Sequence, residues 1–209
     1  MRDEAKLLLA GCLASALALA LVAGAVFHAE ALRHFDARLL VHASAGRFGP
    51  AGDVADAVSH LGDPLPQVLL LAAGVAVALA SGRRVPALAG LALVAGASLT
   101  TLVLKHALAA PRLDPVLSWA QVGEESFPSG HATAAFAMAA AWAIFVPPRW
   151  RLPVACIGIV LASLVAASVV VLRHHFPSDV LGGLLVALAW ACGVLALQIE
   201  NSRRKSCSM

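Results

Sequence analysis

The chain has 209 residues, of which 60% are hydrophobic and only 13% charged. Soluble domains are about 45–50% apolar and about 25% charged, so the composition favours an integral membrane protein over a soluble helical bundle. The formal net charge is only +3, and no Lys/Arg run is longer than the short "SRRKS" near the C-terminus, which argues against nucleic-acid binding.

Six apolar segments follow one another along the chain, and each is expected to be a transmembrane helix. A helix needs about 20 residues to cross the hydrocarbon, with a lower limit of about 17. Backbone polar groups cannot go unpaired in lipid, so helices are expected rather than loops or open sheets. The segments are residues 7–27, 65–81, 85–104, 131–146, 152–172 and 180–199, of which the second and fourth are short. The predicted fold is an all-α, polytopic membrane bundle of six transmembrane helices.

The whole chain, 1–209, is interpreted as one transmembrane domain, with a motif-bearing part at 55–199 and a cytoplasmic tail at 200–209. If the N-terminus is inside, the short basic segments "SGRR", "PPRWR" and "RRK" all lie on the inner side. This pattern predicts a bacterial inner-membrane protein with both termini in the cytoplasm. A cleavable signal peptide is the alternative for residues 1–28, but the apolar run is longer than a typical signal core.

The segment 33–63 is not expected to span the membrane. Val54, Ala57, Val58 and Leu61 form an apolar stripe at helical spacing. The charges around them are mixed and acidic, so the segment is expected to cap the outer face rather than insert into anionic lipid. The sequence "GDPLP" then marks the entry to the second span.

Three polar clusters lie at the ends of apolar segments, all on the predicted outer side. "LKHALAAPRLD" ends the third segment, "FPSGHAT" begins the fourth, and "RHHFPSD" separates the fifth from the sixth. Hydropathy alone does not require the three to share one face. Their coincidence predicts a single site at the outer membrane surface.

The first two clusters have the chemistry of an anion site. Lys105 and Arg112 could hold a dianionic group, Arg through two parallel hydrogen bonds and Lys as a point charge. Ser129 is the predicted N-cap of the fourth segment, where free N–H groups and the positive helix end favour an anion. Gly130 permits close backbone approach, and His131 could donate a proton to a leaving oxygen. Singly, the two cations could also be interfacial charges, and Ser129 only a cap.

The third cluster pairs an imidazole with a carboxylate. Asp179 follows His175 by four residues, and a carboxylate near one ring nitrogen would leave the other nitrogen free for attack. Together the clusters predict phosphoryl transfer without a metal, although Asp179 alone could be a helix cap. The four cysteines have no metal-ligand spacing. A haem site is disfavoured because no His lies in the middle of a span.

At this point the chain resembles the type-2 phosphatidic-acid phosphatase family, membrane lipid phosphatases related to vanadium haloperoxidases. The family motifs are K-x6-R-P, P-S-G-H and S-R-x5-H-x3-D. The second motif is complete at residues 128–131. The first has Leu113 where Pro is usual, and the third has Val169 in place of Arg. The resemblance covers about residues 55–199.

The resemblance implies a role for each matching residue. His175 would attack phosphorus to give a phosphohistidine, Asp179 would orient it, and His131 would protonate the leaving group and later activate water. The phosphate oxygens would be held by Lys105, Arg112, Ser129 and Gly130. No metal or other cofactor is implied. Because Val169 replaces the family's Arg, we hypothesise that Arg173, four residues later on the same helical face, supplies the guanidinium.

The predicted function is hydrolysis of a lipid phosphate monoester or pyrophosphate at the periplasmic face. Undecaprenyl pyrophosphate, phosphatidylglycerol phosphate and phosphatidic acid are the candidate substrates, and membrane lipids are the other expected partners. A lipid phosphotransferase would use the same residues, and a non-catalytic lipid-phosphate binder or transporter with a degenerate site is the alternative of another class. The sequence has no readable code for the head group or for the oligomeric state.

Overall fold

The computed structural model describes residues 2–110 and 122–207, and all regular secondary structure within these ranges is helical. In chain order the helices are α1 (Arg2–His28), α2 (Glu30–Ala43), the 3-10 turn η1 (Ser44–Gly46), α3 (Pro50–Ser59), η2 (His60–Gly62), α4 (Pro64–Ala80), α5 (Arg84–Ala107), α6 (Gly130–Phe145), η3 (Pro148–Trp150), α7 (Arg151–Val171) and α8 (Pro177–Cys207).

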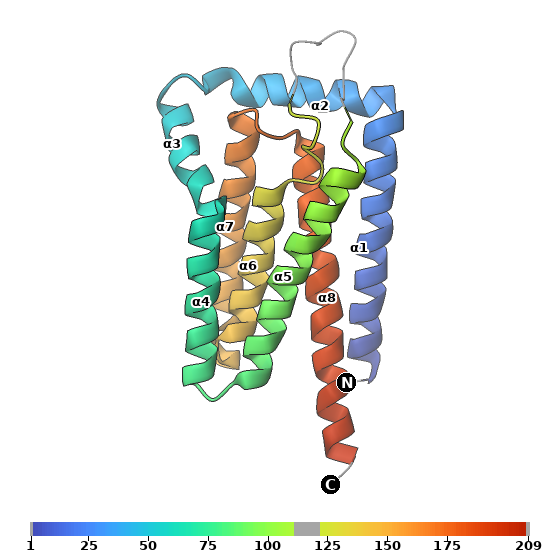
Figure 1. Cartoon of the computed structure of the whole chain (residues 1–209), viewed down its shortest axis with the longest axis vertical. Coiled ribbons are helices and arrows are strands. Elements are labelled where there is room, and N and C mark those ends of the chain that lie inside the picture. Colours follow the sequence, from blue (N-terminus) through green and yellow to red (C-terminus); the bar gives the residue numbers. More distant parts are fainter. Residues whose placement is uncertain (1, 111–121, 208–209) are drawn as a thin grey trace.

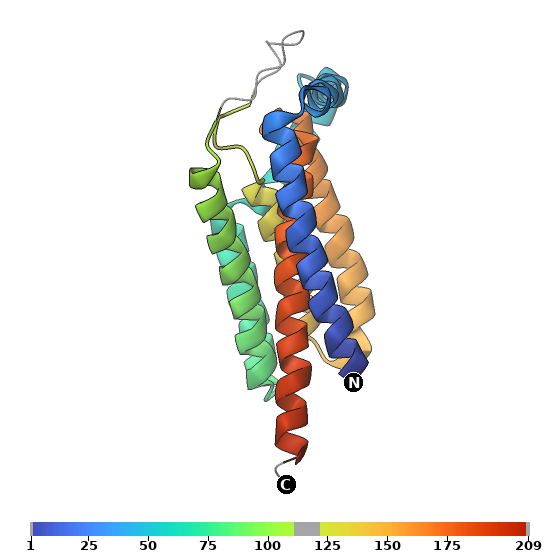
Figure 2. The same cartoon turned by 90° about the vertical axis from the view of Figure 1, so that its right-hand side faces the viewer.

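The bundle is formed by helices that run lengthwise, α1 and α4 to α8, while α2 lies across one end (Figure 1). We call this the α2 end. Both chain termini lie at the opposite end, as Figures 1 and 2 both show. The arrangement places the last turn of α5, the first turn of α6 and the link between α7 and α8 together at the α2 end.

Helix α6 is the centre of the bundle, since it packs against α4, α5, α7 and α8. Small side chains allow this close approach of several helices. Its buried alanines are Ala132, Ala135, Ala137, Ala139 and Ala141. The main apolar core forms where α5 and α8 close on this helix around Phe145 and Leu93.

The expected membrane character is supported, but the six crossings are not. Helices α1, α5, α7 and α8 are long and apolar enough to span a bilayer, and the pair formed by residues 50–62 and α4, bent by 52°, adds a fifth candidate. Helix α6 has only 16 residues, which is below the usual spanning length of about 17. A sixth crossing therefore stays a prediction.

The segment 33–63 lies at the α2 end, as α2, η1, α3 and η2, with α2 crossing the bundle (Figure 1). Within the apolar stripe of this segment, Val54 is 64% exposed and Leu61 44% exposed. The buried face of α3 consists instead of Gly52, Ala55 and Ser59. Small residues make the helix contact here, as is usual where large apolar side chains can face lipid.

Candidate active site

The predicted clusters meet in one cavity of about 590 Å³ at the α2 end. Four predicted site residues line it: Lys105 from the last turn of α5, Gly130 and His131 from the first turn of α6, and His175 from the link between α7 and α8. The rest of the lining is mostly apolar and comes from α4 and α5, including Val68, Leu71, Val94 and Ala95. A polar group and a hydrocarbon chain can therefore occupy the same cavity.

His175 lies in a tight turn that follows α7. The helix ends at Val171, and the N–H groups of His174 and His175 both donate to the carbonyl of Val169, at 2.9 and 3.2 Å. This turn buries His175, whose side chain is only 9% exposed. Burial lowers the pKa of His175 below 6.5, and the nearby carboxylate of Asp179 opposes that shift only in part. The side chain is thus neutral at pH 7 and has a lone pair available.

Asp179 is fully buried in the first turn of α8. Its Oδ2 accepts the backbone N–H of Phe176 at 2.8 Å and lies 3.6 Å from Nδ1 of His175. That separation is slightly longer than a hydrogen bond, and Nδ1 has no hydrogen-bond partner in the described part of the chain. A shift of a few tenths of an ångström would close the contact, and catalytic hydrogen bonds often tighten only when substrate is bound. The arrangement leaves Nε2 as the nitrogen that can attack.

The "PSGH" turn forms the start of α6, as the sequence predicted. The Oγ of Ser129 accepts the N–H of Ala132 at 3.3 Å, the geometry of an N-cap. One expectation is wrong: the Ser129 N–H is not free, because it donates to the carbonyl of Asp179 at 2.9 Å. Ser129 is also completely buried. This hydrogen bond joins the second and third motifs directly.

The N–H groups of Gly130 and His131 remain free at the start of α6, with no acceptor among the described residues. They can therefore bind an anion at the positive end of the helix. A Cβ on Gly130 would meet only Cε of Lys105, at 3.8 Å. The lysine therefore faces the same space, while its Nζ donates to the carbonyl of Glu125 at 2.5 Å.

His131 stands beside His175, with their ring centroids 6.2 Å apart. Its Nε2 is 3.2 Å from Oδ1 of Asp63, the residue that precedes α4. The other carboxylate oxygen of Asp63 lies 2.7 Å from Nδ1 of His60. The pKa of Asp63 is held below its usual value, first by His60 and second by His131. Sequence reasoning treated Asp63 only as part of a turn, although an acid at the start of a span on the predicted site side was a usable signal.

A second missed residue is Asp36 of α2, which is buried. Its Oδ1 accepts the N–H of Ser178 at 3.1 Å, and its Oδ2 accepts the hydroxyl of the same residue. Asp36 thereby caps the start of α8 from a helix 142 positions earlier in the chain. The two acids, Asp36 and Asp179, together hold the turn that carries His175.

The structure does not bring Arg173 into the cavity. Its φ is +61°, so it lies beyond the end of α7 rather than on the helical face of Val169, and that part of the prediction is wrong. Its Nε donates to Oγ of Ser44 at 2.7 Å. Burial, with a smaller contribution from Arg47, lowers the pKa of Arg173. Val169 is fully buried, and Arg112 lies outside the described residues.

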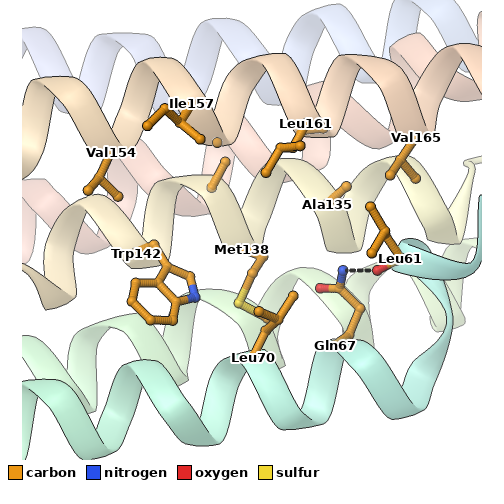
Figure 3. Close-up of a pocket in the computed structure, with 13 residues that line it drawn as sticks. Leu61, Gln67, Leu70, Ala135, Met138, Trp142, Val154, Ile157, Leu161 and Val165 are labelled. Atoms are coloured by element: carbon orange, nitrogen blue, oxygen red, sulfur yellow. Dashed lines mark hydrogen bonds between the residues drawn. The ribbon is translucent and has the colours of Figure 1, made fainter. Parts of the chain in front are cut away.

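A second cavity, of about 340 Å³, lies between α4, α6 and α7 and is shown in Figure 3. Its lining is apolar, with Met138, Trp142 and Leu161 facing inward, and it contains none of the predicted site residues. Gln67 lines both cavities and donates to the carbonyl of Leu61 at 2.7 Å.

Comparison with known proteins finds a matching family and a similar solved structure. The family model of the PAP2 superfamily matches residues 85–203. The chain is also similar to the crystal structure of a transmembrane PAP2 type phosphatidylglycerolphosphate phosphatase from Bacillus subtilis. The TM-score is 0.75 and the identity 25%, over 92% of this chain and 96% of that one. No curated protein matches the chain.

Proposed function

The chain belongs to the PAP2 superfamily, and from that premise we propose that it hydrolyses a phosphate monoester or pyrophosphate of a lipid at the outer face of the membrane. Its membership confirms the resemblance predicted from the three motifs. The observation that carries the proposal is one cavity in which a neutral, buried His175 faces His131, Lys105 and the free start of α6.

In the first step, Nε2 of His175 attacks phosphorus with its lone pair. A P–N bond forms, the bond from phosphorus to the leaving oxygen breaks, and that oxygen takes a proton from His131. Asp179 stabilises the positive charge that develops on the His175 ring, in the way that a buried carboxylate supports the imidazole of a catalytic triad.

In the second step, His131, now neutral, takes a proton from water. The water oxygen attacks phosphorus, the P–N bond breaks, and inorganic phosphate and free His175 result. One residue acts as acid and then as base, as general acid–base catalysis requires when a covalent intermediate forms and breaks.

The phosphate oxygens need positive charge and N–H donors throughout. We propose that Lys105 and the N–H groups of Gly130 and His131 supply them, because these groups face the cavity and a preorganised helix end stabilises developing negative charge. Ser129 contributes by setting the start of α6. The role of Arg112 stays a prediction from the sequence, and so does the replacement of the family's Arg by Arg173.

Lipid substrates fit the remainder of the cavity. Val68, Leu71 and Val94 lie between α4 and α5, where a hydrocarbon chain could extend while the phosphate stays at the α2 end. The similar Bacillus subtilis protein is a phosphatidylglycerolphosphate phosphatase, which supports phosphatidylglycerol phosphate as a first substrate to test. Phosphatidic acid and undecaprenyl pyrophosphate follow.

The membrane placement is also part of the proposal. We propose a bacterial inner-membrane protein with both termini in the cytoplasm and the α2 end in the periplasm. The support is that the two termini lie together at the end opposite α2 (Figure 1), with the short basic segments on their side.

The test is phosphate release by the purified protein in detergent micelles with each of the three lipids. Wild type should release phosphate from at least one, and His175→Ala should reduce the release to background. Equal background release from both proteins on all three lipids would refute hydrolysis. Acceptor-dependent transfer to a second lipid, without free phosphate, would identify a phosphotransferase.

A non-catalytic binder is the second candidate, and one observation favours it. Among the described residues, Lys105 is the cation that lines the cavity, since Val169 replaces the family's Arg and Arg173 bonds to Ser44. Such a binder would retain labelled lipid phosphate without turnover, and Lys105→Ala would release it.

A further inference from the structure

The start of α4 contacts the proposed general acid from outside the three motifs. We propose that Asp63 is a positioning residue for His131: it holds the ring proton on Nε2, so that the other ring nitrogen exchanges protons with the leaving oxygen and with water. This inference rests on the proposed function, because it assigns a partner to the acid of that reaction.

The geometry fixes which nitrogen is engaged. Nε2 of His131 lies 3.2 Å from Oδ1 of Asp63. An ionised carboxylate has no proton to donate, so it can only be the acceptor in this hydrogen bond. The proton of the neutral ring is therefore stabilised on Nε2. Nδ1 is left as the site from which a proton leaves and to which one returns.

The backbone of the same segment holds the ring from a second direction. A Cβ on Gly62 would lie 2.6 Å from Cδ2 of His131 and 3.0 Å from Cγ1 of Val165. The backbone at Gly62 thus packs directly on the imidazole, and no larger residue would fit there. Contact at Cδ2 and a hydrogen bond at the adjacent Nε2 together restrict rotation of the ring.

Other charges keep Asp63 in its accepting form and direction. Nδ1 of His60 lies 2.7 Å from Oδ2 of Asp63, and Nε2 of His60 lies 3.7 Å from Oδ2 of Asp56. His60 therefore occupies one carboxylate oxygen of Asp63 and leaves the other to His131. Asp56 contacts His60 but makes no contact with His131 among the described residues, which makes it a matched control.

The proton inventory of the reaction shows what Asp63 would change. In the first step the imidazolium of His131 gives its Nδ1 proton to the oxygen that leaves phosphorus, and the Nε2 proton stays with Asp63. In the second step Nδ1 takes a proton from the attacking water. Without Asp63 the ring would no longer be held with its Nδ1 proton toward the leaving oxygen, so the first step would slow. In the second step the neutral ring would divide between two tautomers, and the one protonated on Nδ1 cannot accept a proton at that nitrogen.

A role in chemistry is separable from a role in folding. Asp63 is 40% exposed, its side chain makes no capping hydrogen bond to α4, and exposed ion pairs contribute little to stability. Asp63→Ala and Asp56→Ala should therefore both keep wild-type thermal unfolding. Each variant loses a contact with His60, and only Asp63→Ala also loses the contact with His131.

The kinetic test compares two leaving groups. On a lipid phosphate, whose alkoxide needs a proton, Asp63→Ala should lower the single-turnover rate of leaving-group release by about 10- to 100-fold, part of the usual worth of a general acid. The leaving group of p-nitrophenyl phosphate departs without a proton. With this substrate the rate of the first step should fall much less. Asp56→Ala should match wild type on both substrates. Because the second step is common to both substrates, the two are compared on release of the leaving group within a single turnover. Equal losses there on both substrates, or none on the lipid, would overturn the proposal.

A spectroscopic test needs no turnover. In ¹⁵N NMR of histidine-labelled protein at about pH 9, where imidazoles are neutral, His131 should be protonated on Nε2 in wild type and Asp56→Ala. In Asp63→Ala it should shift toward a mixture of tautomers. A wild-type ring protonated on Nδ1, or an unchanged spectrum in Asp63→Ala, contradicts the inference even if the protein proves to be a binder. Whether the protein hydrolyses lipid phosphate at all is tested separately, by comparing phosphate release by wild type and by His175→Ala.

Discussion

Gly130→Ala separates the anion-binding role of the "PSGH" turn from its role in folding. An added Cβ would meet only Cε of Lys105, at 3.8 Å, which is ordinary contact. The position is helical, so alanine should not destabilise the fold and could stabilise it by up to about 0.5–1 kcal/mol. The methyl group would nevertheless occupy cavity space beside the N–H groups that are proposed to hold phosphate.

The magnitude follows from the loss of one preorganised contact. Removing a single oxyanion donor typically costs about 10²–10³ in turnover, which is about 2.7–4 kcal/mol of barrier at 1.36 kcal/mol for each factor of ten. We therefore expect Gly130→Ala to unfold at or slightly above the wild-type temperature and to lose about a hundredfold in kcat.

Two further glycines calibrate the result. Gly24 of α1 has nothing within 4 Å of an added Cβ, so Gly24→Ala should retain wild-type turnover. At Gly183 the Cβ would lie 2.7 Å from the carbonyl oxygen of Ser129, so Gly183→Ala should force α8 away from α6 and lower both stability and activity. Phosphate release is measured in micelles beside thermal unfolding. Wild-type turnover by a folded Gly130→Ala protein would refute anion binding at the start of α6.

Three other predictions follow from single contacts. Asp36→Ala removes the two carboxylate oxygens that accept the N–H and the hydroxyl of buried Ser178, so the free energy of unfolding should fall by about 2–4 kcal/mol; denaturant titration measures this, and an unchanged midpoint would contradict the capping role. Arg173→Ala should keep most of the turnover, because its Nε donates to Ser44; a loss of about a hundredfold would support the clamp role predicted from the sequence. The pKa of His175 is lowered from 6.5 in the folded protein, so the unfolded chain binds the proton more readily, and stability should be full above pH 6.5 and decline as pH falls through the folded pKa. In the pH profile of kcat/KM, the acid limb should likewise lie below pH 6.5. An acid limb above that value would contradict a desolvated nucleophile.

Much of the site was predictable because apolar segments have defined ends. Lys105, His131 and His175 each lie at an end of a hydrophobic run, and spans that alternate in direction from an inside N-terminus place these three ends on one side. The start of α6 at "PSGH" was likewise readable, since Ser before a helical run is a strong N-cap signal. These features depend on spacing along the chain.

The contacts that were missed depend on packing between distant segments. Asp63 and Asp36 come from the segment that covers the α2 end, and no periodic pattern indicates which of its acids point inward. The hydrogen bond from Ser129 to the carbonyl of Asp179 depends on how closely α8 approaches α6, which Gly183 permits. The prediction for Arg173 assumed that α7 continues past Val171, and the positive φ of Arg173 shows that it does not.

The central claim is that Nε2 of His175 forms a bond to phosphorus, and trapping that bond tests it most directly. Wild type is mixed with ³²P-labelled lipid phosphate, quenched in alkali within one turnover and digested for mass spectrometry. Label and added phosphate mass are expected on the peptide that carries His175, in wild type and in Asp56→Ala but not in His175→Ala. Turnover of the lipid with label on another residue, or with none on the protein at any quench time, would contradict a phosphohistidine at this position.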